Sequence, residues 1–80
     1  MTVQVRLFAR YREAAKASSV DVDVPPGATL GDVWTQVLAG IPALPRDERP
    51  LFSCDRAYAR ADTAITGSEE IAVFPPVSGG

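Results

Sequence analysis

The sequence predicts an α+β domain in which one long helix packs across one face of a single sheet. Three observations support this: the chain has 80 residues, segments of strand and helix periodicity follow one another, and one segment stands out as an amphipathic helix. So short a chain closes a single core. A lone helix can bury its apolar side only against a sheet. The first and last strands are the most apolar, and we expect them to be central.

The N-terminal segment predicts a strand followed by a short helix. Residues 2–9 alternate polar and apolar side chains, the pattern of a strand with one face on the core. Residues 11–17 (YREAAKA) contain good helix formers, and the polar Ser18-Ser19 pair marks their end. The arginine-rich start also resembles a mitochondrial presequence, but strand alternation explains it better. The apolar residues of the strand are Val3, Val5, Leu7 and Ala9.

A second strand is predicted directly after this helix. Residues 19–24 alternate a row of valines with Asp21 and Asp23, which is typical of a strand that has one face in water. The segment Pro25-Pro26-Gly27 ends this strand, because proline cannot donate a hydrogen bond to a strand neighbour.

The clearest helix of the chain follows. Thr29 is a natural N-cap and Asp32 stands three residues later, so the pair forms an imperfect capping box that also places negative charge at the helix start. Gly40 fits the first position after the helix, and Pro42 blocks its continuation. The apolar stripe, which we expect in the core, consists of Leu30, Val33, Trp34, Val37 and Leu38.

The C-terminal half predicts a surface loop and three short strands. The loop covers residues 41–50, which are rich in proline and charge. A turn at Asp55-Arg56 joins the first two strands, and a turn at Gly67-Ser68 precedes the last one. The predicted strands are residues 51–54, 57–59 and 71–74.

Composition excludes several classes of protein. The net charge is −2 and the eight basic residues are scattered, whereas nucleic-acid binding needs clustered Lys and Arg. The chain has one cysteine, Cys54, and no histidine, so we expect no disulfide and no metal site. No apolar run approaches the roughly 20 residues of a membrane span. A free thiol without a recognisable signal peptide predicts a cytoplasmic location.

Three candidate sites have simpler structural explanations. The stretch Pro25–Asp32 contains glycines but lacks the lysine and the spacing of a phosphate-binding loop. Cys54 has no neighbouring base and only one adjacent cation, Arg56, so a small apolar role on a strand explains it better. Glu69 and Glu70 point to opposite faces of an extended segment and cannot form a paired-carboxylate site.

The ending VFPPVSGG, residues 73–80, is the strongest functional candidate. Pro75 and Pro76 end strand pairing and favour an extended chain directed away from the sheet. The segment that begins at Pro75 can reach on the order of 20 Å, and Gly79 and Gly80 place only backbone and a carboxylate at its tip. From the residues alone, a functional tail and a frayed end explain this ending equally well.

This ending resembles the C-terminus of the small subunits of molybdopterin synthase, the sulfur carriers of molybdenum cofactor biosynthesis. The stretches VRLFARYREAAK and PPGATLGDVWTQVL are similar to that family's opening strand with its short helix and to its Thr-capped helix. The resemblance implies a ubiquitin-like β-grasp fold, with a β-grasp domain over residues 1–76 and a flexible Gly-Gly tail over 77–80. Cys54-Asp55 and residues 67–70 depart from the usual Val-Asn and Asp-Gly-Asp-Glu, and the first departure leaves the shape of that turn open.

The resemblance also implies a chemistry that uses the bare glycines. An ATP-dependent enzyme related to ubiquitin-activating enzymes would adenylate the Gly80 carboxylate, because a carboxylate itself is a poor acyl donor. A sulfurtransferase would supply the sulfur that displaces AMP and leaves a thiocarboxylate. In a heterotetramer, the large subunit of the synthase would use this sulfur to convert cyclic pyranopterin monophosphate to molybdopterin. The chain would bind no cofactor and would not be catalytic alone.

The residues implied by the resemblance fall into two groups. Gly80 is the residue that reacts, and Gly79 gives the tail a stem thin enough for a narrow pocket. Aromatic residues near a functional tail are typical of interfaces, although half-buried sheet positions explain Phe74 and Tyr58 equally well. The expected partner-binding residues are Phe74, Pro75, Pro76, Val77, Ser78 and Tyr58.

Three other functions stay open. A thiamin-type sulfur carrier shares the fold and the Gly-Gly end, but it is usually shorter and lacks the Phe-Pro-Pro element. A ubiquitin-like modifier would join target lysines through Gly80, and one protein could do both jobs. A β-grasp interaction module would have an inert tail.

Overall fold

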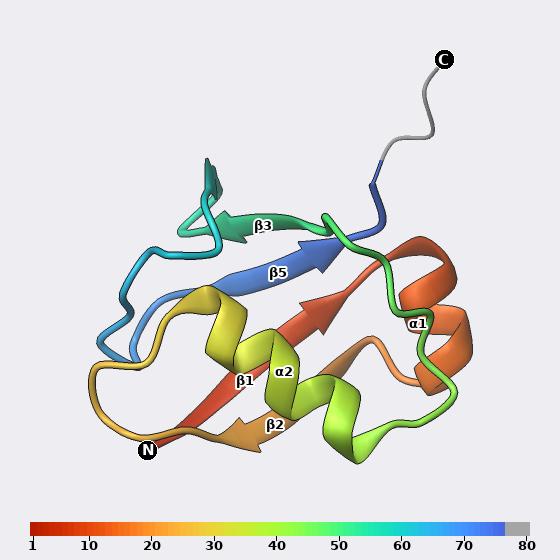
Figure 1. Ribbon diagram of the computed structural model, residues 1–80, viewed down its shortest axis with the longest axis horizontal. Coiled ribbons are helices and arrows are strands. Elements are labelled where there is room, and N and C mark those ends of the chain that lie inside the picture. The colour runs from red at the N-terminus through yellow and green to blue at the C-terminus, as the bar shows by residue number, and fades with distance from the viewer. Residues whose placement is uncertain (77–80) are drawn as a thin grey trace.

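The protein is built on a five-stranded mixed sheet with two helices (Figure 1). The computed structural model describes residues 1–76. The helices are α1 (Ala9–Ala15) and α2 (Leu30–Gly40). The strands are β1 (Thr2–Leu7), β2 (Ser19–Asp23), β3 (Leu51–Cys54), β4 (Ala57–Ala59) and β5 (Ile71–Phe74).

The strand order β2-β1-β5-β3-β4 confirms that the first and last strands lie inside the sheet. β1 and β5 run parallel, with Val5 opposite Ile71 and Leu7 opposite Val73, whereas the other neighbouring strands are antiparallel. Parallel neighbours need a long crossover connection, and here that connection includes α2. One helix across a mixed sheet with parallel terminal strands is the predicted β-grasp fold.

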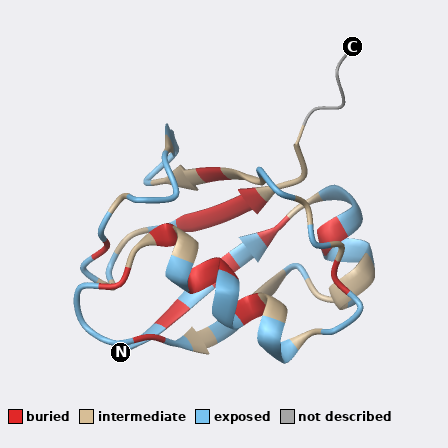
Figure 2. Ribbon diagram, viewed as in Figure 1, coloured by how far each residue is buried: buried red, intermediate tan, exposed pale blue. Residues whose placement is uncertain are grey.

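α2 crosses one face of the sheet, and the core lies between the two (Figure 1). Its N-terminus has a complete capping box: Thr29 Oγ1 accepts from the Asp32 N–H at 3.2 Å, and the Asp32 carboxylate accepts from the Thr29 N–H at 2.9 Å. Figure 2 shows the buried residues on α2 and on the strands that it crosses. The core residues of these elements include Val3, Val5, Leu7, Leu30, Val33, Trp34, Val37, Ile71 and Val73, and Leu38 is half-buried.

The boundary between the first strand and the short helix differs from its prediction. β1 ends at Leu7 instead of Ala9, because Phe8 is the N-cap of α1 and Ala9 turns the chain with a left-handed backbone (φ 52°). α1 also ends earlier than predicted, because Lys16 is its C-cap and takes the left-handed conformation (φ 55°) that commonly stops helices. Neither residue type favours a positive φ, so the sequence gives no sign of these two turns.

The end of α2 also differs from its prediction. Gly40 is the last helical residue, and Ile41 is the C-cap with a non-helical backbone (φ −132°, ψ 86°). A left-handed glycine is not needed here, because Pro42 itself disfavours helical geometry in the residue before it.

The loop of residues 41–50 is partly buried, although its sequence predicts a surface segment. Leu44 is buried in the core. The Asp47 carboxylate accepts hydrogen bonds from the buried Tyr11 hydroxyl at 2.6 Å and from Arg10 at 2.7 Å. We call Arg10, Tyr11 and Asp47 the loop latch, because they fasten this loop to α1.

Candidate functional site

The face of the sheet opposite α2 carries an aromatic cluster beside the end of β5. The Phe74 ring stacks on Phe8, with centroids 4.5 Å apart and an interplanar angle of 16°. Tyr58 approaches Phe74 edge-on at 6.5 Å. We call Phe8, Tyr58 and Phe74 the outer aromatic cluster. It borders the point where the chain leaves the sheet at Pro75, so it lies at the root of the predicted tail.

Strand alternation brings two of these rings together. Phe8 and Phe74 each follow a fully buried residue, Leu7 and Val73, which are partners in the parallel pairing of β1 and β5. Because successive strand residues point to opposite faces, both rings point away from the core. Ala72 shares their face and lies outside the core cluster, yet it is only 7% exposed, which shows that side chains cover this part of the outer face as well.

A hollow of about 210 Å³ opens beside the cluster and is lined by Ser53, Arg56, Tyr58 and Phe74. Tyr58 is 79% exposed, so its ring is available for contact. Tyrosine, phenylalanine and arginine are the side chains that interfaces favour, and they contribute most when a partner shields them from water. The hollow is therefore suited to receive a side chain of another protein.

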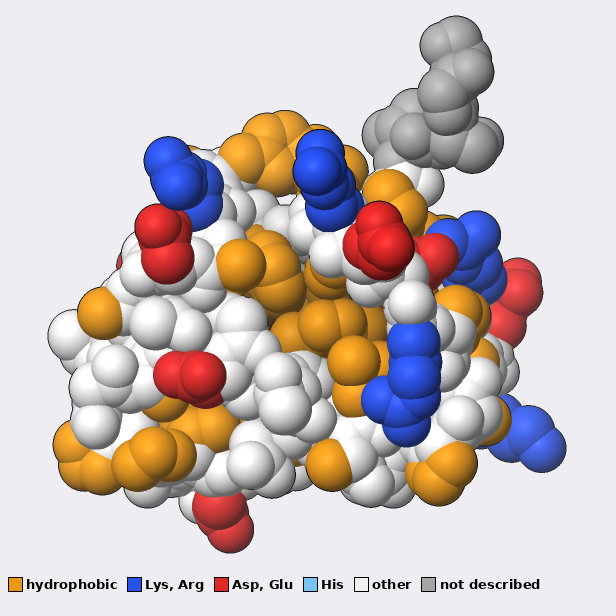
Figure 3. Space-filling view, in the orientation of Figure 1, with side chains coloured by type: hydrophobic (Ala, Val, Ile, Leu, Met, Phe, Trp, Pro, Cys, Tyr) orange, Lys and Arg blue, Asp and Glu red, His pale blue; other side chains and the backbone are white. Residues whose placement is uncertain are grey.

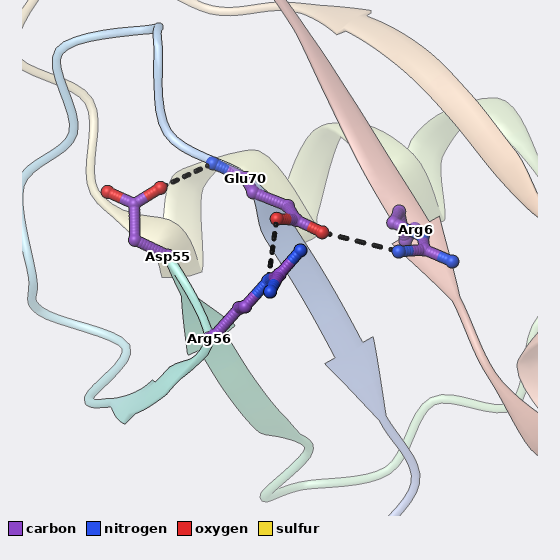
Figure 4. A network of polar contacts seen from close by, with 4 residues as sticks. All are labelled: Arg6, Asp55, Arg56 and Glu70. Carbon is purple, nitrogen blue, oxygen red and sulfur yellow. Dashed lines mark hydrogen bonds and ion pairs between the residues drawn. The ribbon is translucent and has the colours of Figure 1, made fainter.

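A charged network lies beside the cluster, and Figure 4 shows its residues, Arg6, Asp55, Arg56 and Glu70. Glu70 forms ion pairs with Arg6 on β1 at 3.2 Å and with Arg56 after β3 at 3.5 Å. Arg6 also lies over the Phe8 ring, 5.5 Å from its centroid. Exposed ion pairs add little stability, but the two arginines of this network lie next to the aromatic rings, Arg6 over Phe8 and Arg56 in the lining that includes Tyr58 and Phe74.

The turn between β3 and β4 has a regular hairpin shape, which answers the question raised by Cys54-Asp55. Asp55 and Arg56 both have left-handed backbones (φ 52° and 69°), as in a two-residue type I′ turn. The Asp55 N–H donates to the Glu70 carbonyl, and the Asp55 carboxylate accepts from the Glu70 N–H, both at 2.9 Å. The turn is thus tied to the start of β5, next to the charged network.

The structure describes only part of the predicted site. Tyr58, Phe74, Pro75 and Pro76 are described, and strand pairing ends at Phe74 as the two prolines predict. The other predicted residues lie outside the described residues, so their roles stay predictions. These residues are Val77, Ser78, Gly79 and Gly80.

Two weaker candidates have structural roles. Burial raises the pKa of the Cys54 thiol, with smaller contributions from nearby Glu69 and Asp55, so this thiol is a poor nucleophile at neutral pH. The Gly31 N–H, which a phosphate loop would aim at an anion, donates to the Ala61 carbonyl at 2.8 Å.

The adjacent glutamates have separate roles, as predicted. Glu70 belongs to the charged network, whereas the Glu69 carboxylate accepts from the backbone N–H groups of Thr66 and Gly67. The Thr66 hydrogen bond is the main reason that the pKa of Glu69 falls to about 2. Within residues 1–76, no three His, Cys, Asp or Glu side chains are grouped so that they could hold a metal ion.

Sequence reasoning missed Phe8, Arg6 and Arg56 as members of this surface. Phe8 had a detectable signal, because it continues the outward positions occupied by the polar residues Gln4 and Arg6. An aromatic residue in that row predicts a covered or functional outer face. The two arginines carried no such signal, since their shared contact with Glu70 depends on pairing between distant strands.

The surface charge is mixed around this end of the molecule. Figure 3 shows the α2 side, where basic and acidic side chains are interspersed and several lie near the end of the described chain, and on the opposite face Glu70 pairs with Arg6 and Arg56. Such a surface favours a protein partner over a polyanion. No helix within residues 1–76 has the length and apolar character needed to cross a membrane.

Comparison with known proteins gives consistent matches. The ThiS family model matches residues 5–80. The molybdopterin synthase sulfur carrier subunit of Chlamydomonas reinhardtii is 31% identical over 83 residues, which cover all of both chains. Small archaeal modifier protein 1 of Haloferax volcanii is 34% identical over 94% of this chain and 97% of its own length. The crystal structure of SAMP1 from Haloferax volcanii has a TM-score of 0.82 at 29% identity and covers all of both chains.

Proposed function

The chain belongs to the ThiS family, and from this premise we propose that it is a sulfur carrier whose Gly80 bears the sulfur as a C-terminal thiocarboxylate. The observation that carries the proposal is the outer aromatic cluster at the root of the ending VFPPVSGG. A partner that holds the cluster would bring the tail to a fixed place. The relative named as a sulfur carrier subunit, which matches over its whole length, supports the same reading.

The chemistry of the proposal begins with activation of the carboxylate. An adenylating enzyme joins the Gly80 carboxylate to AMP from ATP and releases pyrophosphate. A sulfide equivalent from a sulfurtransferase then attacks the Gly80 carbonyl carbon, and AMP leaves. A glycine stem suits both steps, because reaction pockets that exclude water are narrow and a side chain would clash there.

This chain's own contribution is binding and positioning. It has no histidine, and its one thiol has a raised pKa, so the acid–base work belongs to partner enzymes. Phe74, Pro75 and Pro76 would orient the tail, and Tyr58 with Phe8 would anchor the partner. Truncation of such anchors often costs an interface tenfold or more, that is ≥ about 1.4 kcal/mol.

We propose that the sulfur is used in molybdenum cofactor biosynthesis. The algal relative is a sulfur carrier subunit of molybdopterin synthase, which supports an assembly of this chain with a further subunit. In that assembly, a heterotetramer, two sulfur deliveries would convert cyclic pyranopterin monophosphate to molybdopterin. A thiamin-type pathway uses the same activation and would differ only in the enzyme that receives the sulfur.

The test is the intact mass of the chain after incubation with its adenylating enzyme, ATP and a sulfur source. We expect a gain equal to the replacement of one oxygen by one sulfur, located on Gly80 by fragmentation. A variant without Gly80 should fold normally and show no gain, and Gly79→Val should fold but charge poorly. If the intact chain shows no gain with a competent enzyme, the carrier function is wrong and an interaction module is the better reading.

A second candidate function is protein modification through Gly80. The specific observation in its favour is the 34% identity to a relative named as a modifier protein, which matches over nearly all of both chains. The same adenylate would then react with an amine instead of a sulfur donor. Isopeptide-linked species in cell extract that contain the C-terminal glycine peptide would support it, and their absence beside a clear thiocarboxylate would exclude it.

A further inference from the structure

Amino groups are scarce on this chain, although positive charge is not. Of its eight basic residues, seven are arginines and one is a lysine, Lys16. Arginine stays protonated at physiological pH and does not accept acyl groups, whereas a lysine amine does once it has lost a proton. If the C-terminal carboxylate is activated, the chain therefore offers a single side-chain amine to the acyl group.

The other amine of the chain is engaged in the fold. The Met1 amino group donates to the Val24 carbonyl at 2.8 Å in a partly buried position. The Val24 N–H donates in return to the Met1 carbonyl at 2.9 Å. An attack by this amine would break the first of these bonds and separate Met1 from the end of β2, so acylation there is disfavoured.

Lys16 is exposed and accessible. It is the C-cap of α1, and its backbone N–H, not its side chain, bonds to the Glu13 carbonyl. Within residues 1–76 its side chain is in none of the ion pairs or hydrogen bonds that hold the fold. An open recess of about 370 Å³ lies beside it and is lined by Arg12, Glu13, Lys16, Ala17 and Ser18. The recess leaves room for an incoming backbone that carries no side chains.

We propose that Lys16 is the acceptor at which a second copy of this chain becomes linked, through an isopeptide bond from the Gly80 of that copy. The proposal rests on the activation step of the proposed function. The unprotonated Lys16 amine attacks the Gly80 carbonyl carbon of the acyl-adenylate, a carbon–nitrogen bond forms, the bond to AMP breaks, and the amine proton passes to solvent. ATP and the adenylating enzyme are the co-reactants.

This arrangement has a consequence for the products. Each copy has one donor, Gly80, and one acceptor, Lys16, so linked chains are unbranched. When sulfur is present, the sulfur donor and Lys16 compete for the same adenylate. The linked product should therefore accumulate when the sulfur source is withheld and decline when it is added.

The experiment uses the full chain with its adenylating enzyme and ATP, with and without a sulfur source. Pyrophosphate release measures activation, and intact mass with fragmentation measures linkage. We expect a covalent dimer with a Gly80–Lys16 bond when the sulfur source is withheld. Lys16→Arg should lower the dimer at least tenfold and leave pyrophosphate release unchanged, since Lys16 is outside the outer aromatic cluster. Arg12→Lys combined with Lys16→Arg is the matched control, because it keeps the charge and moves the lysine by one helical turn.

Each outcome either supports or overturns Lys16 as the acceptor. Dimer from the wild type alone supports Lys16 as the acceptor. Pyrophosphate release without dimer, linkage through Met1, a monomer that has lost water, or full dimer yield from the control variant would overturn it. If no pyrophosphate is released with a competent enzyme, the proposed function fails and the linkage fails with it, so the two failures are distinguishable.

Discussion

Removal of one oxygen atom tests the loop latch. In Tyr11→Phe the ring remains in its fully buried position, 4.9 Å from the Trp34 ring, and only the hydroxyl that donates to Asp47 at 2.6 Å is lost. The volume of the core is unchanged, so no cavity term arises. The change in stability therefore reports the hydrogen bond between α1 and the loop of residues 41–50.

The expected cost follows from the surroundings of that bond. A hydrogen bond to a charged group typically contributes about 1.5–3 kcal/mol to stability. Here the Asp47 side chain is 22% exposed and keeps Arg10 at 2.7 Å, so water can replace the hydroxyl. We expect about 1 kcal/mol, below that range. For a domain of this size, that lowers Tm by about 4–8 °C.

Urea unfolding followed by the fluorescence of Trp34, with thermal unfolding as a second measure, provides the assay. Tyr58→Phe is the matched control, because Tyr58 is 79% exposed and its substitution should change the free energy of unfolding by less than about 0.5 kcal/mol. In the background of Asp47→Asn, the effect of Tyr11→Phe should shrink. An unchanged midpoint in Tyr11→Phe, or equal effects in both backgrounds, would refute the latch.

Three further predictions concern other parts of the fold. Phe8→Ala removes the stack on Phe74 and should lower the free energy of unfolding in urea by about 1–2 kcal/mol. The same variant should bind the adenylating enzyme roughly tenfold or more weakly in a titration. Gly67→Ala should destabilise by about 1–2 kcal/mol in thermal unfolding, because φ is +105° and the new Cβ would lie 2.8 Å from Met1 Sδ. Folding lowers the pKa of Glu69 from 4.5 to about 2, so the stability that its carboxylate gives the fold is present above pH 4.5 and is lost as the pH falls toward 2. In Glu69→Gln the urea midpoint should therefore depend less on pH across this window.

The pKa of Asp47 gives the latch an acid dependence of the same sign. The Tyr11 hydrogen bond, followed by the Arg10 hydrogen bond, lowers the pKa of this carboxyl from 3.8. A carboxyl with a lowered pKa stabilises the fold above its unfolded value and loses that contribution as pH falls through the folded value. Tyr11→Phe should therefore cost less in acid than at neutral pH.

The sequence predicts the regular parts of the fold well because their signals are local. Alternation along residues 2–7 and the Thr29–Asp32 cap each depend on residues a few positions apart, and both occur in the structure. No local sequence pattern indicates the left-handed backbones of Ala9 and Lys16, so the observed bounds of α1 differ from the predicted ones. The latch and the partnership of Phe8 with Phe74 join residues far apart in the chain. Periodicity within one segment does not specify which distant segment it will contact, and here α1 meets the loop of residues 41–50 and the end of β1 meets the end of β5.

Phe8 of the outer aromatic cluster and Tyr11 of the loop latch lie close together in the sequence but make different contacts. Variants at these two positions should therefore separate effects on stability from effects on function. Phe8 caps α1 and packs on Phe74 outside the sheet, whereas Tyr11 lies within the helix and points into the core. Loss of the Tyr11 hydroxyl leaves every group of the cluster in place. Well below its Tm, Tyr11→Phe should thus be charged at the wild-type rate, and Phe8→Ala should be charged slowly even where it is fully folded. Slow charging of Tyr11→Phe under those conditions would show that α1 positions the tail, and the division of roles would be wrong.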